Sequence, residues 1–154
     1  MKNADLQEIS KLSSKHAPPR TDLRQARIKD DWGSTNGASV ELKHKKPDDV
    51  TIEHFEAYCD VFGYIHPTDL LFYLYPVIRE TIDDPEFVGS IDFLAALNTK
   101  FERLNGKLSP EDQSTLLKGI RFIKDADFKA NGSDEFFWDE YETLRKSLGM
   151  KSES

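Results

Sequence analysis

The most obvious candidates for catalysis or metal binding in this 154-residue chain are His54, Cys59 and His66. A cysteine nucleophile needs a nearby imidazole to lower its pKa, and a metal site needs several converging ligands. His54 and Cys59 are five residues apart, so on one helix their side chains point in different directions. Cys59 also shares an apolar stripe with Phe55 and Phe62, where cysteine packs as a small hydrophobic residue. We therefore predict no catalytic residue, no cofactor and no metal site.

A hydrolase or transferase is the alternative from the enzyme class. Its site would combine His54 or His66 with carboxylates from other helices, a set that only the fold could assemble. The sequence contains no phosphate-binding glycine loop, nucleophile elbow or zinc-ligand spacing. Asp125-Ala126-Asp127 resembles the start of a calcium loop, but neither possible register supplies the acid that calcium binding requires at the twelfth position.

A second alternative comes from Arg20, Arg24 and Arg27, whose spacing places them on one face of a helix. A basic stripe of this kind can contact phosphates, as in a nucleic-acid-associated regulator. The stripe has no aromatic stacking platform and belongs to an acidic protein. These features favour a solvated face, or contact with the protein's own acidic body, over nucleic-acid binding.

The charge is distributed unevenly along the chain. Residues 1–50 hold 10 Lys/Arg and 8 Asp/Glu, net +2, whereas residues 51–154 hold 11 and 20, net −9. An acidic body repels nucleic-acid phosphates and anionic membranes and attracts a basic partner. A net charge of this size also keeps a small protein soluble. The partner we predict is a basic protein, with neither membrane nor nucleic acid involved.

The clearest acidic ridge lies near the C-terminus, beside two aromatic residues that fall off the apolar stripe of the last predicted helix. An exposed aromatic side chain ringed by acids suits an anchor for a basic partner. Alternatively, these aromatic residues pack against a neighbouring helix or the N-terminal arm. The predicted partner-binding residues are Asp134, Glu135, Phe136, Trp138, Asp139 and Glu142.

Hydrophobic periodicity predicts the elements that position these residues. Residues 67–83 are apolar on every side, which is typical of a helix surrounded by protein. Pro67 suits a first helical position, and Pro76 should kink the helix near Phe72. Leu70–Tyr75 could instead form a buried strand, but no second strand of comparable quality exists to pair with it. We therefore predict a central, kinked helix.

Other segments show apolar stripes on one side only, which predict amphipathic helices around the central one. Ser109-Pro110 is the clearest start signal, since serine caps the helix and proline fills its first position. The predicted amphipathic helices are roughly 3–15, 22–31, 51–63, 84–104, 110–131 and 133–148.

The fold class that follows is all-α, a compact single-domain helical bundle with a peripheral N-terminal helical arm. The arm is expected over residues 1–50, the helical body over 51–150 and a disordered tail over 151–154. A single cysteine, a polar N-terminus and the absence of any run of ~20 apolar residues predict a cytoplasmic protein.

Part of the chain also resembles a group of small bacterial helical proteins. The order Phe72-Tyr73-Leu74-Tyr75-Pro76, a long helix, then Leu108-Ser109-Pro110-Glu111-Asp112 is similar to their Tyr-Leu-Pro helix and Leu-Thr/Ser-Pro-Glu-capped helix. Some families of this size and style are similar to immunity proteins, which neutralise a secreted toxin. The resemblance covers about residues 52–125 and departs at Tyr75, which separates Leu74 from Pro76. It implies an all-α fold and an antitoxin role, and it transfers no catalytic residue.

Overall fold

The computed structural model describes residues 1–42, 45–104 and 106–132, together with Glu142 and Lys146. Within these residues all regular structure is helical, which confirms the predicted all-α fold. Three short 3-10 helices connect the longer ones: η1 (Pro47–Asp49), η2 (Cys59–Tyr64) and η3 (Phe101–Leu104). The α-helices are α1 (Asn3–Ser14), α2 (Leu23–Asp30), α3 (Ile52–Tyr58), α4 (Pro67–Asp83), α5 (Gly89–Lys100) and α6 (Pro110–Asn131).

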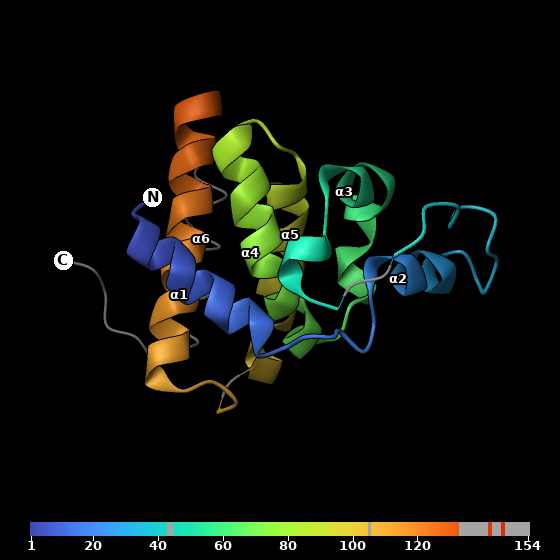
Figure 1. The fold of residues 1–154 in the computed structure, drawn as a ribbon, viewed down its shortest axis with the longest axis horizontal. Coiled ribbons are helices and arrows are strands. Elements are labelled where there is room, and N and C mark those ends of the chain that lie inside the picture. Colours follow the sequence, from blue (N-terminus) through green and yellow to red (C-terminus); the bar gives the residue numbers. More distant parts are fainter. Residues whose placement is uncertain (43–44, 105, 133–141, 143–145, 147–154) are drawn as a thin grey trace.

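Helix α4 occupies the bounds predicted for the central helix, and α1, α5 and α6 all pack against it (Figure 1). His66 caps it and Pro67 fills its first position. The packing against α6 is close, because a Cβ added at Gly119 would lie 3.0 Å from the Leu74 side chain. The fully buried apolar side chains of α4 are Leu70, Leu71, Phe72, Tyr73, Leu74, Val77 and Ile78.

A side chain from α1 enters the hydrogen-bond ladder of α4 next to Pro76. In a regular helix the Tyr75 N–H would donate to the Leu71 carbonyl. Here the Tyr75 N–H donates to Ser13 Oγ (2.9 Å), and that hydroxyl donates to the Leu71 carbonyl (2.7 Å). The buried Ser13 hydroxyl therefore bridges these two backbone groups one residue before Pro76, whose missing N–H would have donated to the Phe72 carbonyl. The bend expected at Pro76 stays a prediction.

The N-terminal segment is more tightly integrated than the peripheral arm that we predicted. Ile9, Leu12, Leu23 and Ala26 are buried in the same apolar core as α4, α5 and α6. The side chains of α4 also hold the start of α2, since the Leu23 N–H donates to the Tyr73 hydroxyl (3.0 Å). The physical reason is that α4 is apolar on all sides. The faces that α5 and α6 do not cover are buried only when the N-terminal helices pack against them.

The helix predicted from residue 84 begins later. The Asp84 carboxylate accepts the Glu86 N–H (3.0 Å), a local turn that competes with helix formation, and α5 starts at Gly89. Phe87 is still buried, as expected for the inner stripe. Near its end α5 gives way to the 3-10 turn η3. Within the helix predicted over 133–148, the structure describes Glu142 and Lys146, and both are helical; the predicted tail over 151–154 lies outside the described residues.

Helix α2 lies at the end of the molecule opposite α6 (Figure 1). Asp22 caps it in a capping box with Gln25, the start that the sequence predicted. Beyond Asp31 the chain leaves α2 in irregular turns that the structure describes as far as residue 42. This segment carries the most exposed large hydrophobic side chain of the described residues.

Candidate functional site

Most of the predicted partner-binding ridge cannot be located in the structure. Asp134, Glu135, Phe136, Trp138 and Asp139 lie outside the described residues, and the ridge as a whole stays a prediction. Glu142 is described: it is helical and half-buried.

The two histidines considered for catalysis both act at helix starts. The Thr51 N–H, at the beginning of α3, donates to His54 Nδ1 (2.9 Å). The Thr68 N–H, in the first turn of α4, donates to His66 Nδ1 (3.4 Å). Burial lowers the pKa of His54, which favours the neutral ring that this acceptor role requires. The histidines thus supply acceptors for otherwise unsatisfied N–H groups of two different helices.

The arginine stripe contacts its own protein, as one of the two favoured interpretations predicted. Arg27 pairs with Asp60 of η2 and with Asp30 (3.4 Å) beside it on α2, and the hydrogen bond to Asp60 raises the pKa of Arg27. Arg24 Nε donates to the Ala38 carbonyl (3.0 Å) in the following loop. Arg20 is exposed. Two of the three arginines therefore anchor α2 and its loop.

Trp32 is the outstanding surface residue of the described chain, since 99% of its side chain is exposed. It follows α2 directly, and its φ of +58° lies in the left-handed region. The Gly33 N–H donates to the Ile28 carbonyl (2.8 Å) and the Trp32 N–H to the Lys29 carbonyl (3.3 Å). This is a Schellman motif with tryptophan at the position that glycine usually occupies.

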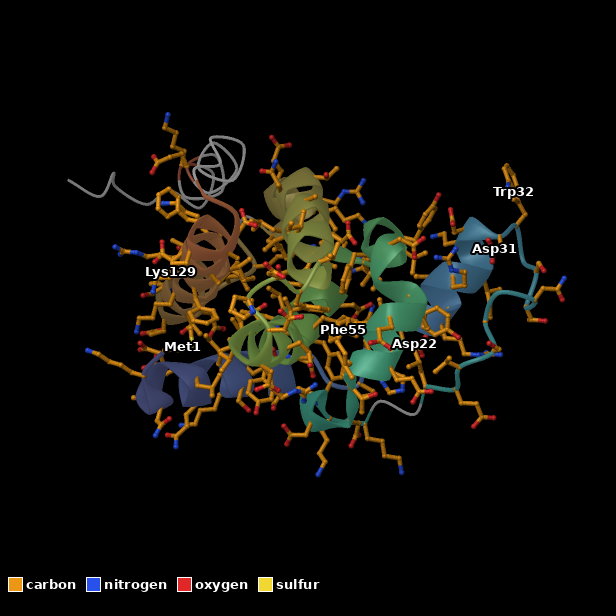
Figure 2. The ribbon with its side chains drawn as sticks, turned by 90° about the horizontal axis from the view of Figure 1, so that it is seen from above. Met1, Asp22, Asp31, Trp32, Phe55 and Lys129 are labelled. Atoms are coloured by element: carbon orange, nitrogen blue, oxygen red, sulfur yellow. The ribbon has the colours of Figure 1, made fainter. Side chains whose placement is uncertain are left out.

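The loop that follows Trp32 is tied to the helices at several points. The Tyr58 hydroxyl accepts the Val40 N–H and donates to the Val40 carbonyl, both at 2.8 Å. A Cβ added at Gly37 would lie 2.8 Å from the Asp31 carboxylate, so the loop lies close against the end of α2. Trp32 is therefore presented from a fixed base, and Figure 2 shows it projecting from the end of the molecule opposite Met1 and Lys129.

Two carboxylates, Asp30 and Asp31, directly precede Trp32 in the chain. Tyr64 of η2 is exposed, and the Asp30 carboxylate raises its pKa. Asp31 also lies within 3.8 Å of Arg27. We call Asp30, Asp31, Trp32 and Tyr64 the Trp32 platform. An exposed indole beside carboxylates can be buried by a partner and can pair with cations at its rim.

The sequence did not predict the Trp32 platform, since Trp32 lies between the helices predicted over 22–31 and 51–63 and belongs to neither apolar stripe. One local signal could have revealed it: Trp32-Gly33 follows a short helix whose apolar residues are Leu23, Ala26 and Ile28. A tryptophan at the end of such a helix, off its stripe and followed by glycine, has little core to enter. Its exposure depends on the tertiary structure.

Among the described side chains, no group of three or more His, Cys, Asp or Glu residues could hold a metal ion. None of the helices that can be described is long and apolar enough to cross a membrane. Comparisons of the chain with protein-family models, with curated proteins and with solved structures find no match.

Proposed function

We propose that this chain is a non-catalytic, cytoplasmic protein-binding module whose partner is a basic protein. The observation that supports the proposal is Trp32. Its side chain is almost fully exposed, and its backbone has a left-handed conformation that is unfavourable for tryptophan. A left-handed conformation costs a residue other than glycine about 1–2 kcal/mol. Because the indole buries almost nothing in the fold, folding gains nothing in return.

Burial of that indole in a complex would provide the missing gain. An aromatic side chain buries about 150–250 Å² at an interface, and about 25 cal/mol per Å² makes such a residue a strong anchor. Tryptophan is also enriched among the residues that dominate interface energies. The fixed loop base lowers the entropy lost on binding, since the anchor is already in position.

Charge supports a basic partner. The chain has a net charge of −7, and Asp30 and Asp31 directly precede Trp32. Opposite charge on the partner would increase the association rate, an effect that falls with rising salt. Immunity against a toxin is the specific form of this proposal, and its support is the resemblance over residues 52–125.

The first test compares three immobilised baits: wild type, Trp32→Ala and Phe128→Ala. Phe128 is a matched control, because it is a second exposed aromatic residue and lies on α6 at the other end of the molecule. Lysate from cells that produce the chain is passed over each bait, and captured proteins are quantified by mass spectrometry. Any protein lost only with Trp32→Ala is purified for binding measurements.

The expected result is a basic protein whose affinity falls about 30-fold with Trp32→Ala, equivalent to about 2 kcal/mol. Phe128→Ala should change that affinity by about twofold or less. Capture that does not depend on Trp32, or an acidic protein as the dependent species, would contradict the proposal.

The predicted C-terminal ridge has its own test. Asp139→Lys with Glu142→Lys should slow association with the purified partner and flatten its salt dependence, because steering depends on local charge. If both quantities are unchanged while Trp32→Ala still weakens binding, the ridge hypothesis is wrong and the Trp32 anchor stands.

The immunity form is tested by the neighbouring genes. A large secreted protein with a variable C-terminal domain, encoded immediately upstream, is the expected partner. The purified domain should bind the wild-type chain and lose its toxicity on binding. Failure to bind would reject immunity and leave the broader proposal to the capture experiment.

A further inference from the structure

A groove separate from the Trp32 platform lies between the start of α3 and the turn that precedes α5. Its volume is about 260 Å³, and Phe55 and Phe87 form its floor. Sites for drug-sized molecules usually measure about 300–1,000 Å³. This groove therefore has room for one large apolar side chain and not for a typical small-molecule ligand.

The floor of the groove is built by the core. The rings of Phe55 and Phe87 meet edge to face with their centroids 5.4 Å apart. A Cβ added at Gly89 would lie 2.3 Å from the Phe87 ring, so glycine is needed there for Phe87 to take this position. Both phenylalanines are buried against other core residues. The groove is thus preformed, which lowers the free energy lost on binding.

The lips of the groove are apolar and face solvent. Ile52 is 41% exposed on one side and Val88 is 63% exposed on the other. Exposed apolar side chains on both sides of a groove are typical of a binding surface.

Every charged residue that lines the groove is acidic: Glu56, Asp84 and Glu86. The contrast with a larger groove of about 530 Å³ between α1 and α6 is informative. That groove has both signs of charge, and they pair with each other, Lys15 with Asp112 (2.8 Å) and Lys118 with Glu8 (3.1 Å). The charged side chains that line the smaller groove are all negative, so the groove would attract a positively charged ligand.

We infer that this acidic-rimmed groove binds a short basic segment of a protein partner. One large apolar side chain of the segment would pack between Ile52 and Val88, above the buried Phe55 and Phe87 rings that support the groove. Flanking lysine or arginine residues would pair with the rim carboxylates, and arginine can do so with two parallel hydrogen bonds. The inference rests on the proposed function in one respect, the basic character of the partner.

The test uses a fluorescein-labelled peptide with one central leucine flanked on each side by two arginines. Its affinity is measured by fluorescence anisotropy for wild type and two double variants. Glu56→Lys/Glu86→Lys reverses charge at the groove. Glu102→Lys/Glu111→Lys reverses two exposed acids on η3 and α6 and changes the net charge equally.

The expected loss of affinity is about tenfold or more for the groove variant and about twofold or less for the control variant. A peptide with serine in place of leucine should bind about tenfold more weakly than the leucine peptide. Val88→Ser should reproduce that loss with the leucine peptide. Circular dichroism and thermal unfolding verify that each variant is folded.

Three results would overturn the inference. They are absence of peptide binding, equal losses in the two double variants, and equal affinity for the leucine and serine peptides. Sedimentation that shows a wild-type dimer abolished by Glu56→Lys/Glu86→Lys would place a second copy of the chain in the groove and also reject a basic segment. Trp32→Ala separates the two proposals, because it should impair capture of the partner and leave peptide binding unchanged.

Discussion

Two residues of the described chain are unusual for the helices they belong to, Pro76 inside α4 and Trp32 after α2, and their surroundings differ. Near Pro76 the backbone is buried, and Ser13 from another helix bonds both the Tyr75 N–H and the Leu71 carbonyl. Trp32 has a left-handed backbone at the surface, and its side chain is almost fully exposed. The fold supplies a polar contact beside the proline and buries almost none of the tryptophan.

This difference separates stability from binding. A buried irregularity must be satisfied, because an unpaired backbone group in the core costs about 1–3 kcal/mol. An exposed, unfavourable conformation can persist only if the rest of the fold supplies the stability, and such conformations cluster at functional sites. For this reason Ser13 and Pro76 have a structural role in our account, and Trp32 has the proposed binding role.

The largest expected effect is at the centre of the core. Leu74→Ala should lower the free energy of unfolding by about 2–5 kcal/mol, since a fully buried leucine leaves a cavity against Gly119. Ile82→Ala, at an exposed position on the same helix, should cost less than about 1 kcal/mol. Urea unfolding measures both. A loss below about 1 kcal/mol for Leu74→Ala would contradict a central position of α4.

The next effect tests the compensation at Pro76. Ser13→Ala should cost about 1–3 kcal/mol, because the Tyr75 N–H and the Leu71 carbonyl lose their partner. Ser14→Ala is the matched control: this exposed hydroxyl donates only to the Ser10 carbonyl (2.8 Å) and should change stability by about 0.5 kcal/mol or less.

A double-mutant cycle sharpens this prediction. Pro76→Ala restores an N–H that can donate to the Phe72 carbonyl and so regularises this turn of the helix, and Ser13→Ala should therefore cost less in that background. Equal costs of Ser13→Ala in both backgrounds would show that the hydroxyl does not compensate for proline.

At Trp32 a substitution should raise the free energy of unfolding instead of lowering it. Trp32→Gly should raise it by about 0.5–1 kcal/mol, because glycine adopts the left-handed conformation without strain. Part of this gain is offset because glycine has more conformational freedom in the unfolded chain. The same variant should lose the basic partner. Thermal and urea unfolding provide the stability, and a clear loss of stability would show that Trp32 is structural.

The smallest effect concerns pH. Burial lowers the pKa of His16 and of His54 below the ordinary 6.5. The unfolded chain therefore takes up these protons first as pH falls. The stabilising contribution is complete above about pH 6.5 and is lost as pH falls through the folded-state pKa values.

His54→Gln isolates one of these two groups. Glutamine can still accept the Thr51 N–H and does not titrate in this range. Urea unfolding at about pH 7.5 and about pH 5.5 should show a smaller loss of stability in the variant than in wild type. An unchanged difference between the two pH values would exclude His54 as a contributor.

Local signals predicted the helix starts well. Asp22 caps α2, Ser109 caps α6 with Pro110 in the first position, and α4 begins at Pro67 as expected. A cap or a first-position proline acts within one turn, so neighbouring residues are enough to recognise it. The start predicted at residue 84 was wrong, because the Asp84 side chain forms a turn that competes with the helix.

The candidate sites were less predictable from sequence. Both are on surfaces that distant segments create: the loop under Trp32 is held by Tyr58, and the groove joins Phe55 to Phe87. The ridge predicted near Asp139 rests on local composition and stays a prediction.

The sequence by itself determined the helical class, the apolar central helix and the acidic charge, because periodicity, caps and composition are properties of neighbouring residues. Only the tertiary structure decided that the Ser13 side chain bonds the backbone of α4, that α1 belongs to the core and that Trp32 stays outside the core. These outcomes depend on contacts between residues tens of positions apart, and competition for a single core settles which apolar side chains are buried.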